Sequence, residues 1–439
     1  MFSIAPDTCT FRSKPMRYAQ SKAPLRETRR SFLIAALVLA ALLFTVNPAA
    51  AEYRIQPALT LSEEYNDNVF LTPTNPTHDY ITRVLPSLHF VYSAPLWDWD
   101  VAYAYDYRYY NYKSRIHDST STLSLTNHTT LVKDFFFIDL KDIYSRVSLD
   151  SIHDFTQQSL FVNQTDSNIA SATPYFTLNL SSRMTASTGY QYRNVWYKDP
   201  RAIDKTDHIV FADVSDEMSL KTFMTAAVRY THTETKLLTL NRTDVSAGPR
   251  YEYADGSRIW FIIGNTWFAS EQQEIRGSQA FWDTGIIHKF RTYSLSFNAA
   301  LTYVDDPLRI LRREDRYVGT FRKETERFTL GVTVGLWEYR DILTKHLQDT
   351  RYSSGGTVSY VITPALQGTY SLTIDRYVND QTETYYMLYL DMVRLAYQLG
   401  ANTTLAVNYL FTHGYSPDAV NFNQNYDNNR INLELTKQF

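Results

Sequence analysis

The histidines and carboxylates could do acid–base or metal chemistry, and their spacing argues against both. No two of the ten histidines lie at the spacing of metal ligands, and no Gly-x-Ser-x-Gly segment marks a nucleophilic serine. Glu63 and Glu64 are adjacent, as are Asp305 and Asp306, but the chain has 46 Asp and Glu in total. We therefore expect no catalytic site, no metal and no cofactor. An outer-membrane enzyme acting on lipid A or polysaccharide remains an alternative.

Two polar segments could bind or block rather than catalyse. Residues 66–75 are rich in Asn, Asp, Thr and Pro, so they could cap or enter a pore, although a solvated loop is the favoured interpretation. Ser416–Asn429 is rich in Asn and contains Asp418 and Asp427, and oxygen ligands of this kind suit Ca²⁺. Their spacing is undefined, so we predict no metal site there.

A basic cluster lies in and beyond the segment 305–316. It consists of Arg309, Arg312, Arg313 and Arg316, with Arg322 and Lys323 following. Such a cluster could meet anionic lipopolysaccharide or an acidic polymer. The favoured interpretation is a solvated loop of mixed charge.

The candidate residues above are predicted to lie on or between β-strands, because apolar and polar side chains alternate with period two after residue 51. The pattern is clear in 293–303, 328–336 and 405–411, and no long helical pattern separates such stretches. A soluble sandwich would also alternate. The repetition without helices, with Tyr and Trp at the ends of several apolar faces, favours a transmembrane barrel with a polar lumen.

The last strand of the chain has the same pattern. Ile431, Leu433, Leu435 and Phe439 share its apolar face, which only Lys437 interrupts. A terminal aromatic residue on such a strand resembles the signal that the barrel-insertion machinery reads in outer-membrane proteins, so we predict that role for these residues. These eleven residues alone would also suit the final strand of a soluble sandwich.

The breaks between strands alternate in length. Short ones are typical of periplasmic turns and include 94–96, 254–257, 363–365 and 400–402. Longer polar ones are expected to be extracellular loops: 66–79, 151–166, 305–316, 341–350 and 416–428. We predict one all-β domain, an antiparallel up-and-down transmembrane barrel with an even number of strands, about 16–20, and both termini on one side. Our count is about twenty; 206–219 and 279–290 are weakly patterned, so sixteen or eighteen remain alternatives.

The first 51 residues are typical of a secretory signal peptide, which leaves 52–439 as the barrel. Arginines precede an apolar run from Phe32 to Val46, and the small residues Ala49 and Ala51 come directly before the predicted cleavage position, which precedes Glu52. Met16 is an alternative start. The segment 28–33 also resembles a twin-arginine signal, but a barrel must cross the inner membrane unfolded, which favours the general secretory route.

The composition excludes other classes of protein. The only cysteine, Cys9, lies in the predicted signal peptide, so disulfides contribute nothing to the mature chain. Residues 1–51 hold seven of the 43 Lys and Arg and two of the 46 Asp and Glu, so the remainder has a net charge of −8. This balance argues against binding to nucleic acid. Tyrosine supplies 34 residues and suits a surface that is apolar on one side and wet on the other.

The segment 59–92 resembles a known family. Its residues 63–75 match the pattern E-x-Y-N-D-N-x-x-L-T-P-x-N, and it continues through Asp79–Leu88. This resembles the opening of the outer-membrane β-barrel family associated with exosortase/PEP-CTERM systems and exopolysaccharide loci. The resemblance implies a place in the outer membrane of a Gram-negative bacterium, beside polysaccharide export and surface-protein sorting. It implies no catalytic residues.

We therefore expect a non-enzymatic, porin-like barrel in the bacterial outer membrane, associated with exopolysaccharide export or surface-protein sorting. The expected partners are outer-membrane lipids and lipopolysaccharide, the insertion machinery, and exopolysaccharide or its export components. A plugged barrel acting as an anchor in the same system is the alternative. The inward side chains at mid-barrel decide between an open pore and a plug.

Overall fold

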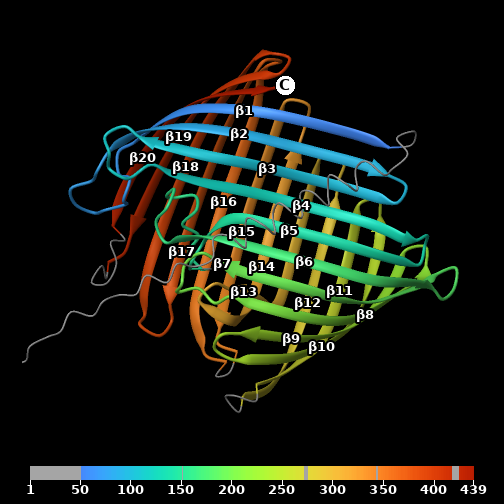
Figure 1. The fold of residues 1–439 in the computed structure, drawn as a ribbon. Helices are drawn as coiled ribbons and strands as arrows, with labels where there is room; N and C mark the ends of the chain where they lie inside the picture. Colours follow the sequence, from blue (N-terminus) through green and yellow to red (C-terminus); the bar gives the residue numbers. More distant parts are fainter. Residues whose placement is uncertain (1–50, 151, 271–274, 343–344, 418–424) are drawn as a thin grey trace, which may run out of the picture. The chain divides into compact units, whose positions relative to one another are not determined.

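Residues 52–439 fold into a closed barrel of twenty antiparallel strands (Figure 1). The computed structural model describes residues 51–150, 152–270, 275–342, 345–417 and 425–439. Each strand pairs with the next along the chain, and the first pairs with the last, so the sheet closes on itself. The predicted fold, a single all-β up-and-down barrel with an even strand number, is confirmed. The strand number is the upper limit of the predicted range.

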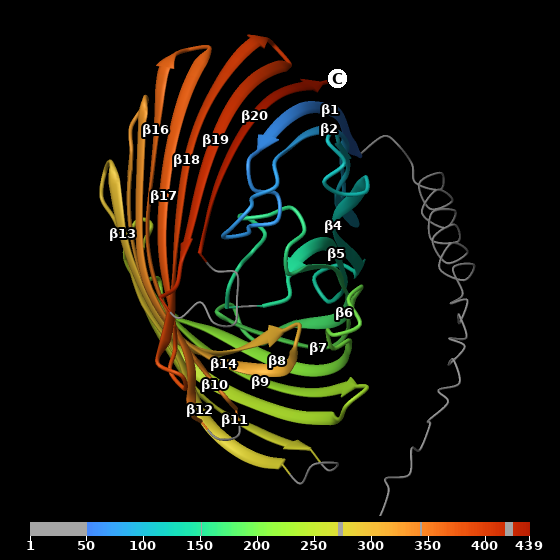
Figure 2. The same cartoon turned by 90° about the vertical axis from the view of Figure 1, so that its left-hand side faces the viewer.

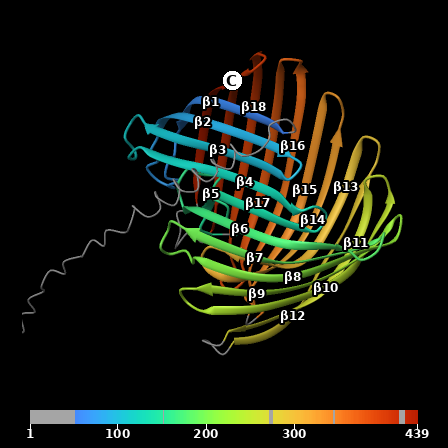
Figure 3. The same cartoon turned by 45° about the vertical axis from the view of Figure 1, so that its right-hand side comes forward.

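The strands follow one another around the wall in sequence order, as Figure 3 shows. They are 13 to 17 residues long, whereas about 9–11 tilted residues cross a bilayer, so their ends extend beyond the hydrocarbon. Their bounds are β1 Glu52–Asn66, β2 Asp79–Ala94, β3 Trp97–Tyr110, β4 Asp118–Val132, β5 Phe136–Ser148, β6 Gln164–Asn179, β7 Met184–Tyr197, β8 Lys205–Ser219, β9 Thr222–Thr235, β10 Thr239–Ala254, β11 Ser257–Ser270, β12 Ile275–Lys289, β13 Tyr293–Asp306, β14 Arg309–Glu324, β15 Phe328–Arg340, β16 Leu347–Thr363, β17 Leu366–Asn379, β18 Thr384–Gly400, β19 Thr403–Tyr415 and β20 Tyr426–Gln438.

The alternation of the sequence becomes an outer apolar face and an inner polar face. Arg108 and Arg430 donate hydrogen bonds to carbonyl groups of the β5–β6 loop, which lies inside the barrel (Figure 2), and this marks the inner face. Residues that are paired on adjacent strands point to the same side of the sheet, so the register assigns the inner face on every other strand. On β13, Leu295 and Phe297 therefore point outward, whereas Ser296 points into the lumen. The weakly patterned segments 206–219 and 279–290 are strands β8 and β12.

The two ends of the barrel differ, but the predicted alternation of long and short connections holds only in part, because 236–238, 307–308 and 380–383 at the second end are also short. Turns of two to four residues close one end, where Glu52 and Gln438 also lie; we call this the short-turn end. These turns are 95–96, 133–135, 180–183, 220–221, 255–256, 290–292, 325–327, 364–365 and 401–402. The opposite, long-loop end carries the β1–β2 loop (67–78) and the β5–β6 loop (149–163). In outer-membrane barrels the short turns face the periplasm.

The predicted signal peptide, with Ala49, lies outside the described residues, and its cleavage stays a prediction. Ala51 is the first described residue, and β1 begins directly after it, at Glu52. Within the described ranges, no helix is long and apolar enough to cross a membrane.

The seam between β1 and β20 is closed by the residues of the E-x-Y-N-D-N pattern. Asp67 accepts two hydrogen bonds from Asn429, one from its backbone and one from its side chain, each 2.7 Å long. The Asn428 amide donates to the side chain of Asn66 and to the carbonyl of Asn68. These bonds join the two ends of the chain where the pairing of β1 with β20 stops. We call this network the clasp.

An ion pair completes the clasp on the inner face. The Arg430 guanidinium holds both carboxylate oxygens of Glu64, at 2.9 and 3.0 Å, and the Glu64 side chain is 2 % exposed. Removing one member of a buried ion pair leaves the other charged and desolvated, at a cost of about 3–5 kcal/mol.

We therefore expect Glu64→Ala to weaken barrel closure strongly. The refolded variant should lose its compact, heat-modifiable electrophoretic migration at a clearly lower temperature than the wild type. Replacing both partners with Met should recover much of the loss, because no buried charge then remains unpaired. Glu324→Ala is the matched control: its ion pair with Arg322 is 60 and 65 % exposed and contributes at most about 1 kcal/mol. Equal effects of the two single substitutions would contradict this role of the clasp.

Candidate functional site

The β1–β2 loop turns into the barrel rather than outward. Val69 and Leu71 are buried, and Val69 packs with Ile81 and Tyr110 of the wall. The side chain of Asn68 fixes the turn, because its amide donates to the Thr72 carbonyl and its oxygen accepts from the Thr72 backbone. The favoured interpretation of residues 66–75 as a solvated loop is therefore wrong, since the apolar side chains between the turn residues find a buried site inside the barrel.

The β5–β6 loop crosses the lumen. Ile152 is buried against a cluster on the opposite wall, formed by side chains of β15, β17 and β18: Tyr339, Tyr377, Tyr386, Leu388 and Leu390. The ring of His153 lies 4.2 Å from that of Tyr377, and Gln158 accepts a hydrogen bond from Tyr426. Figure 2 shows this loop and the β1–β2 loop within the ring of strands. Together they narrow the long-loop half of the lumen.

The tip of the β13–β14 hairpin is the third inward segment. Pairing between β12 and β13 stops at Trp282 and Leu301, whereas β13 and β14 stay paired up to Asp306 and Arg309. The tip leaves β12 and reaches the start of β8, where the backbone of Ile203, in the β7–β8 connection, donates to the Pro307 carbonyl at 2.8 Å. We call residues 302–312 the hairpin tip.

Lys205 of β8 anchors the hairpin tip. Its ammonium group donates to the carbonyl oxygens of Asp306, at 3.2 Å, and Ile310, at 2.8 Å, and its side chain is buried. Ile310 and Leu311 also pack against an apolar cluster of Leu238, Leu240 and Phe268. Apolar contacts and a buried cation therefore hold the tip against the inner face of the wall.

The prediction of an extracellular loop at 305–316 is wrong. Only Pro307 and Leu308 form the turn, and the arginines of the basic cluster lie on strand β14. Arg312 is buried and pairs with Asp306 at 2.9 Å, and Arg313 holds both oxygens of Asp315. The sequence shows a dense cluster of charge, but only the inward bend of the hairpin explains why that charge is paired inside the protein.

A cavity of about 610 Å³ lies where the three inward segments meet. Its lining combines apolar side chains with charged and phenolic groups: Phe70, Leu71, Leu149, Asp150, Ile152, His153, Phe155, Val162, Asn163, Asp306, Leu308, Arg309, Arg312, Asp349, Asn379, Tyr386 and Tyr426. Aromatic and aliphatic surface with a few placed polar groups is typical of sites for small solutes. We call this space the constriction cavity.

Asp150 and His153 form an ion pair in the β5–β6 loop beside this cavity, 2.5 Å apart. Burial alone would raise the pKa of Asp150, but the hydrogen bond and charge of His153, together with two backbone amides, hold that pKa below its usual range. A lowered carboxyl pKa stabilises the folded loop above the pKa of the unfolded chain, and this contribution is lost only as the pH falls through the lowered value. The contribution of Asp150 to the stability of the folded loop is therefore present at neutral pH.

Beyond the constriction, the inner face is lined by hydroxyl groups and small side chains. Thr60 and Thr436 share a hydrogen bond of 2.9 Å across the seam between β1 and β20. Thr357 with Ser371, and Ser359 with Thr369, share hydrogen bonds of 3.0 Å between β16 and β17. Some charged residues of the inner face are paired across strands, for example Arg351 of β16 with Asp375 of β17, and Arg394 of β18 with Glu434 of β20. This arrangement provides a wetted surface with alternating donors and acceptors.

The predicted insertion-signal residues lie together on the outer face of β20. Ile431, Leu433, Leu435 and Phe439 are all exposed, as a lipid-facing row would be in the absence of lipid. Lys437 shares that face opposite Leu59 of β1. The backbone of Phe439 donates to the Pro57 carbonyl at 3.0 Å, so it is part of the seam. Their role in insertion stays a prediction.

The considered metal segment 416–429 falls partly outside the described residues, Asp418 included. Asp427 pairs with His413 at 2.6 Å instead of forming a ligand set. Among the residues that the structure describes, no group of three or more His, Cys, Asp and Glu could hold a metal.

The sequence analysis did not identify the β5–β6 loop as part of a site. A signal was present, because Leu149, Ile152 and Phe155 and then Leu160–Val162 interrupt a segment read as a polar loop. Apolar residues in a long loop indicate a buried surface. Which wall they contact could not be read from their spacing.

Comparison with solved structures finds the same fold at very low sequence identity. The siderophore receptor PirA from Pseudomonas aeruginosa matches 90% of this chain and 81% of its own, with a TM-score of 0.50 and 10% identity. The apoprotein form of the FrpB iron transporter from Neisseria meningitidis matches 88% and 81%, with a TM-score of 0.50 and 9% identity. A ferric enterobactin receptor (PfeA) mutant from Pseudomonas aeruginosa matches 88% and 80%, with a TM-score of 0.50 and 8% identity.

No family model matches the sequence. No curated protein matches it significantly. The structural similarity is confined to the fold, which is that of bacterial outer-membrane β-barrels.

Proposed function

We propose that this chain is a porin-like, non-enzymatic barrel of the bacterial outer membrane that admits small polar solutes through a narrowed lumen. The observation that carries the proposal is the constriction cavity, which opens within a lumen lined by hydroxyl groups and paired charges. Such a lining can replace the water bound to a sugar-like solute with hydrogen bonds from the protein. The exposed apolar outer face of the barrel suits contact with lipid. Lipids, lipopolysaccharide and the insertion machinery are the partners this proposal requires.

Association with exopolysaccharide export or surface-protein sorting is the finer part of the proposal. It is supported by the resemblance of segment 59–92 to barrels of exosortase/PEP-CTERM systems, and by tyrosines such as Tyr386 and Tyr426 at the constriction cavity. Part of the matching pattern forms the clasp, so the resemblance supports a shared way of closing the barrel more directly than a shared cargo. Exopolysaccharide or its export components are the partners proposed here.

A plugged barrel serving as an anchor in the same system is the second candidate. The β5–β6 loop favours it, because the loop crosses the lumen and buries Ile152 against the far wall. A loop held by buried apolar contacts opens less readily than one held by surface charges.

Liposome swelling with refolded protein tests the proposal. We expect glucose and disaccharides to enter and oligosaccharides of increasing length to be excluded, because the constriction sets an upper size. Entry of none of these sugars, with correct folding shown by heat-modifiable migration, would refute the conduit and leave the anchor. A deletion strain that retains polymer export but loses surface proteins would also favour the anchor.

A further inference from the structure

Two neighbouring spaces lie behind the hairpin tip, on the other side from the constriction cavity. One has a volume of about 270 Å³ and the other about 120 Å³, and both are lined by Arg242 and Tyr303. The larger space is walled by the inner face of β9, β10 and β12 and the smaller by that of β7 to β10, and residues of the β13–β14 hairpin cover both. At about 30 Å³ per water, the larger space corresponds to roughly nine waters, which is room for one sugar ring. We call the two spaces the crevice.

The crevice is lined by more cations than anions. The cations are Arg193, Lys205, Arg229 and Arg242, and the carboxylates are Asp207 and Asp244. Each carboxylate is already engaged by one arginine and one threonine: Asp207 by Arg193 and Thr233, and Asp244 by Arg242 and Thr266. The lining therefore presents net positive charge to whatever enters.

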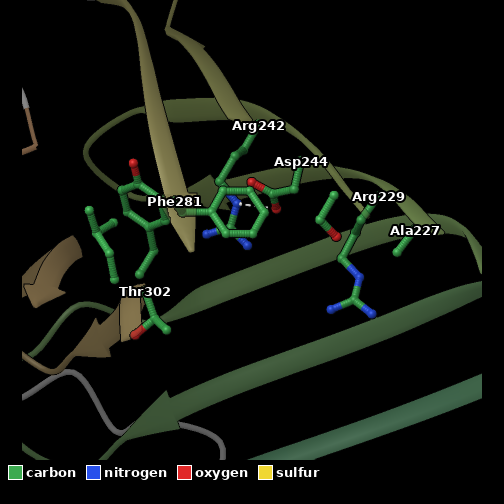
Figure 4. A pocket seen from close by; sticks show the side chains of 9 residues that line it. Ala227, Arg229, Arg242, Asp244, Phe281 and Thr302 are labelled. Carbon is green, nitrogen blue, oxygen red and sulfur yellow. Dashed lines mark hydrogen bonds and ion pairs between the residues drawn. The ribbon is translucent and has the colours of Figure 1, made fainter. Parts of the chain in front are cut away.

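Arg229 is the cation available to a ligand. In Figure 4 it projects from β9 to the side of the sheet on which Phe281 and Thr302 lie. Its side chain is exposed in the lumen, and it makes no hydrogen bond or ion pair within the described part of the chain. Asp213 of β8 lies close enough to interact electrostatically with Arg229 and partly offsets its charge, but it forms no ion pair with it. A guanidinium in this state can take a carboxylate or phosphate with two hydrogen bonds.

A buried hydroxyl without a partner provides a second, independent indication of a ligand. Thr231 is 5 % exposed, its Oγ1 has no hydrogen-bond partner among the described residues, and it lines the smaller space. A buried polar group left unsatisfied costs about 1–3 kcal/mol, and a bound molecule or water would recover that cost.

The remaining lining suits a hydroxylated ring. Ser246 and Thr302 offer donors and acceptors. The Tyr303 hydroxyl donates to Gln279 and so offers an acceptor, and the rings of Tyr303 and Phe281 offer flat apolar faces. Gly264 makes room for the Phe281 ring, because a Cβ at that position would overlap it. A lining with a cation at one end, and with hydroxyl groups and aromatic rings at the other, fits a sugar that carries an acidic group.

We propose that the crevice is a binding site for a monosaccharide that carries one anionic group, a carboxylate or a phosphate. Arg229 binds the anion, Thr231 and the neighbouring hydroxyls bind the ring hydroxyls, and Tyr303 and Phe281 pack on the ring. The inference deepens the proposed function, since the ligand reaches the site through the lumen, and it names the class of solute that this part of the lumen selects.

Calorimetric titration of the refolded full chain in detergent tests this assignment. The probes are glucuronate, glucose 6-phosphate, glucose and acetate. We expect both anionic sugars to bind at least about tenfold more tightly than glucose, because a hydrogen bond to a charged group contributes about 1.5–3 kcal/mol, and acetate to bind more weakly than glucuronate. Tighter binding of one of the two sugars identifies the anion. Glucose binding as tightly as glucuronate, or acetate matching it, would overturn the assignment.

Variants locate the site. Arg229→Gln should weaken glucuronate binding about tenfold, and Arg229→Lys should recover part of it. Thr231→Val, which is nearly isosteric, should weaken binding severalfold without affecting the charge. Arg322→Gln is the control, because Arg322 lies on the inner face of β14 toward the short-turn end, away from the crevice, in an exposed ion pair. Equal weakening by Arg322→Gln, or none by Arg229→Gln with intact heat-modifiable migration, would refute the site.

Failure of this inference and failure of the proposed function are distinguishable. Binding is measured without a membrane, whereas passage is measured by liposome swelling with neutral sugars. If the barrel binds no acidic sugar but admits glucose, only the crevice assignment is refuted. If it binds glucuronate but admits no sugar, only the proposed conduit is refuted.

Discussion

Replacing residues 150–162 with a short Gly-Ser linker should raise the single-channel conductance of the refolded barrel about fivefold or more, because a barrel of this size has a wide aqueous lumen once its filling segments are gone. The linker is geometrically simple, since the backbone of Leu149 already donates to the Asn163 carbonyl at 2.9 Å. The change removes Ile152 and His153 from the far wall and leaves the strands β5 and β6 in place. Planar-bilayer recording measures the effect.

A matched control is available at the same end of the barrel. The β17–β18 turn, 380–383, joins neighbouring strands. Replacing it with a linker of the same length should leave the conductance close to that of the wild type. If the deletion of 150–162 leaves the conductance unchanged while folding stays intact, the β5–β6 loop is not what narrows the lumen, and the conduit proposal loses its constriction.

Deleting Phe439 should abolish most assembly of the protein into the outer membrane. Phe439 is the last residue on the outer apolar row of β20, and its backbone closes the seam against Pro57. The deletion therefore removes an aromatic anchor from the membrane interface and one hydrogen bond from the closing pair of strands. The measurement is the fraction of outer-membrane protein with compact, heat-modifiable migration.

Lys437→Tyr is the control for that experiment. Lys437 occupies the same outer face near the short-turn end, where its long stem can reach the membrane interface at little cost. An aromatic residue at that position should assemble as well as the wild type or better. Wild-type migration of the Phe439 deletion would refute the insertion signal, and a loss in Lys437→Tyr equal to that of the deletion would show that any change on this strand disturbs assembly.

The clasp joins the first strand of the barrel to the last, which also carries the predicted insertion-signal residues. The first strand brings Glu64 and Asn66, and the last brings Asn428 and Arg430, to the same corner of the barrel. Such a match cannot be read from either segment alone, because the partners are more than 360 residues apart in sequence. The pattern at 63–68 is recognisable in the sequence, but its purpose requires the register of β1 against β20.

The sequence by itself determined the fold class, the even strand number, the short turns at one end of the barrel, and the row Ile431, Leu433, Leu435 and Phe439 on one face. All of these follow from period two, which each strand displays locally and which needs no knowledge of its neighbours. Tertiary structure alone decided which long segments fold inward. The inward bend of the β13–β14 hairpin depends on Lys205, about a hundred residues earlier in the chain, and the β5–β6 loop depends on a wall more than 180 residues later. Those contacts depend on closure of the barrel, which brings distant strands face to face across the lumen, and no local pattern encodes them.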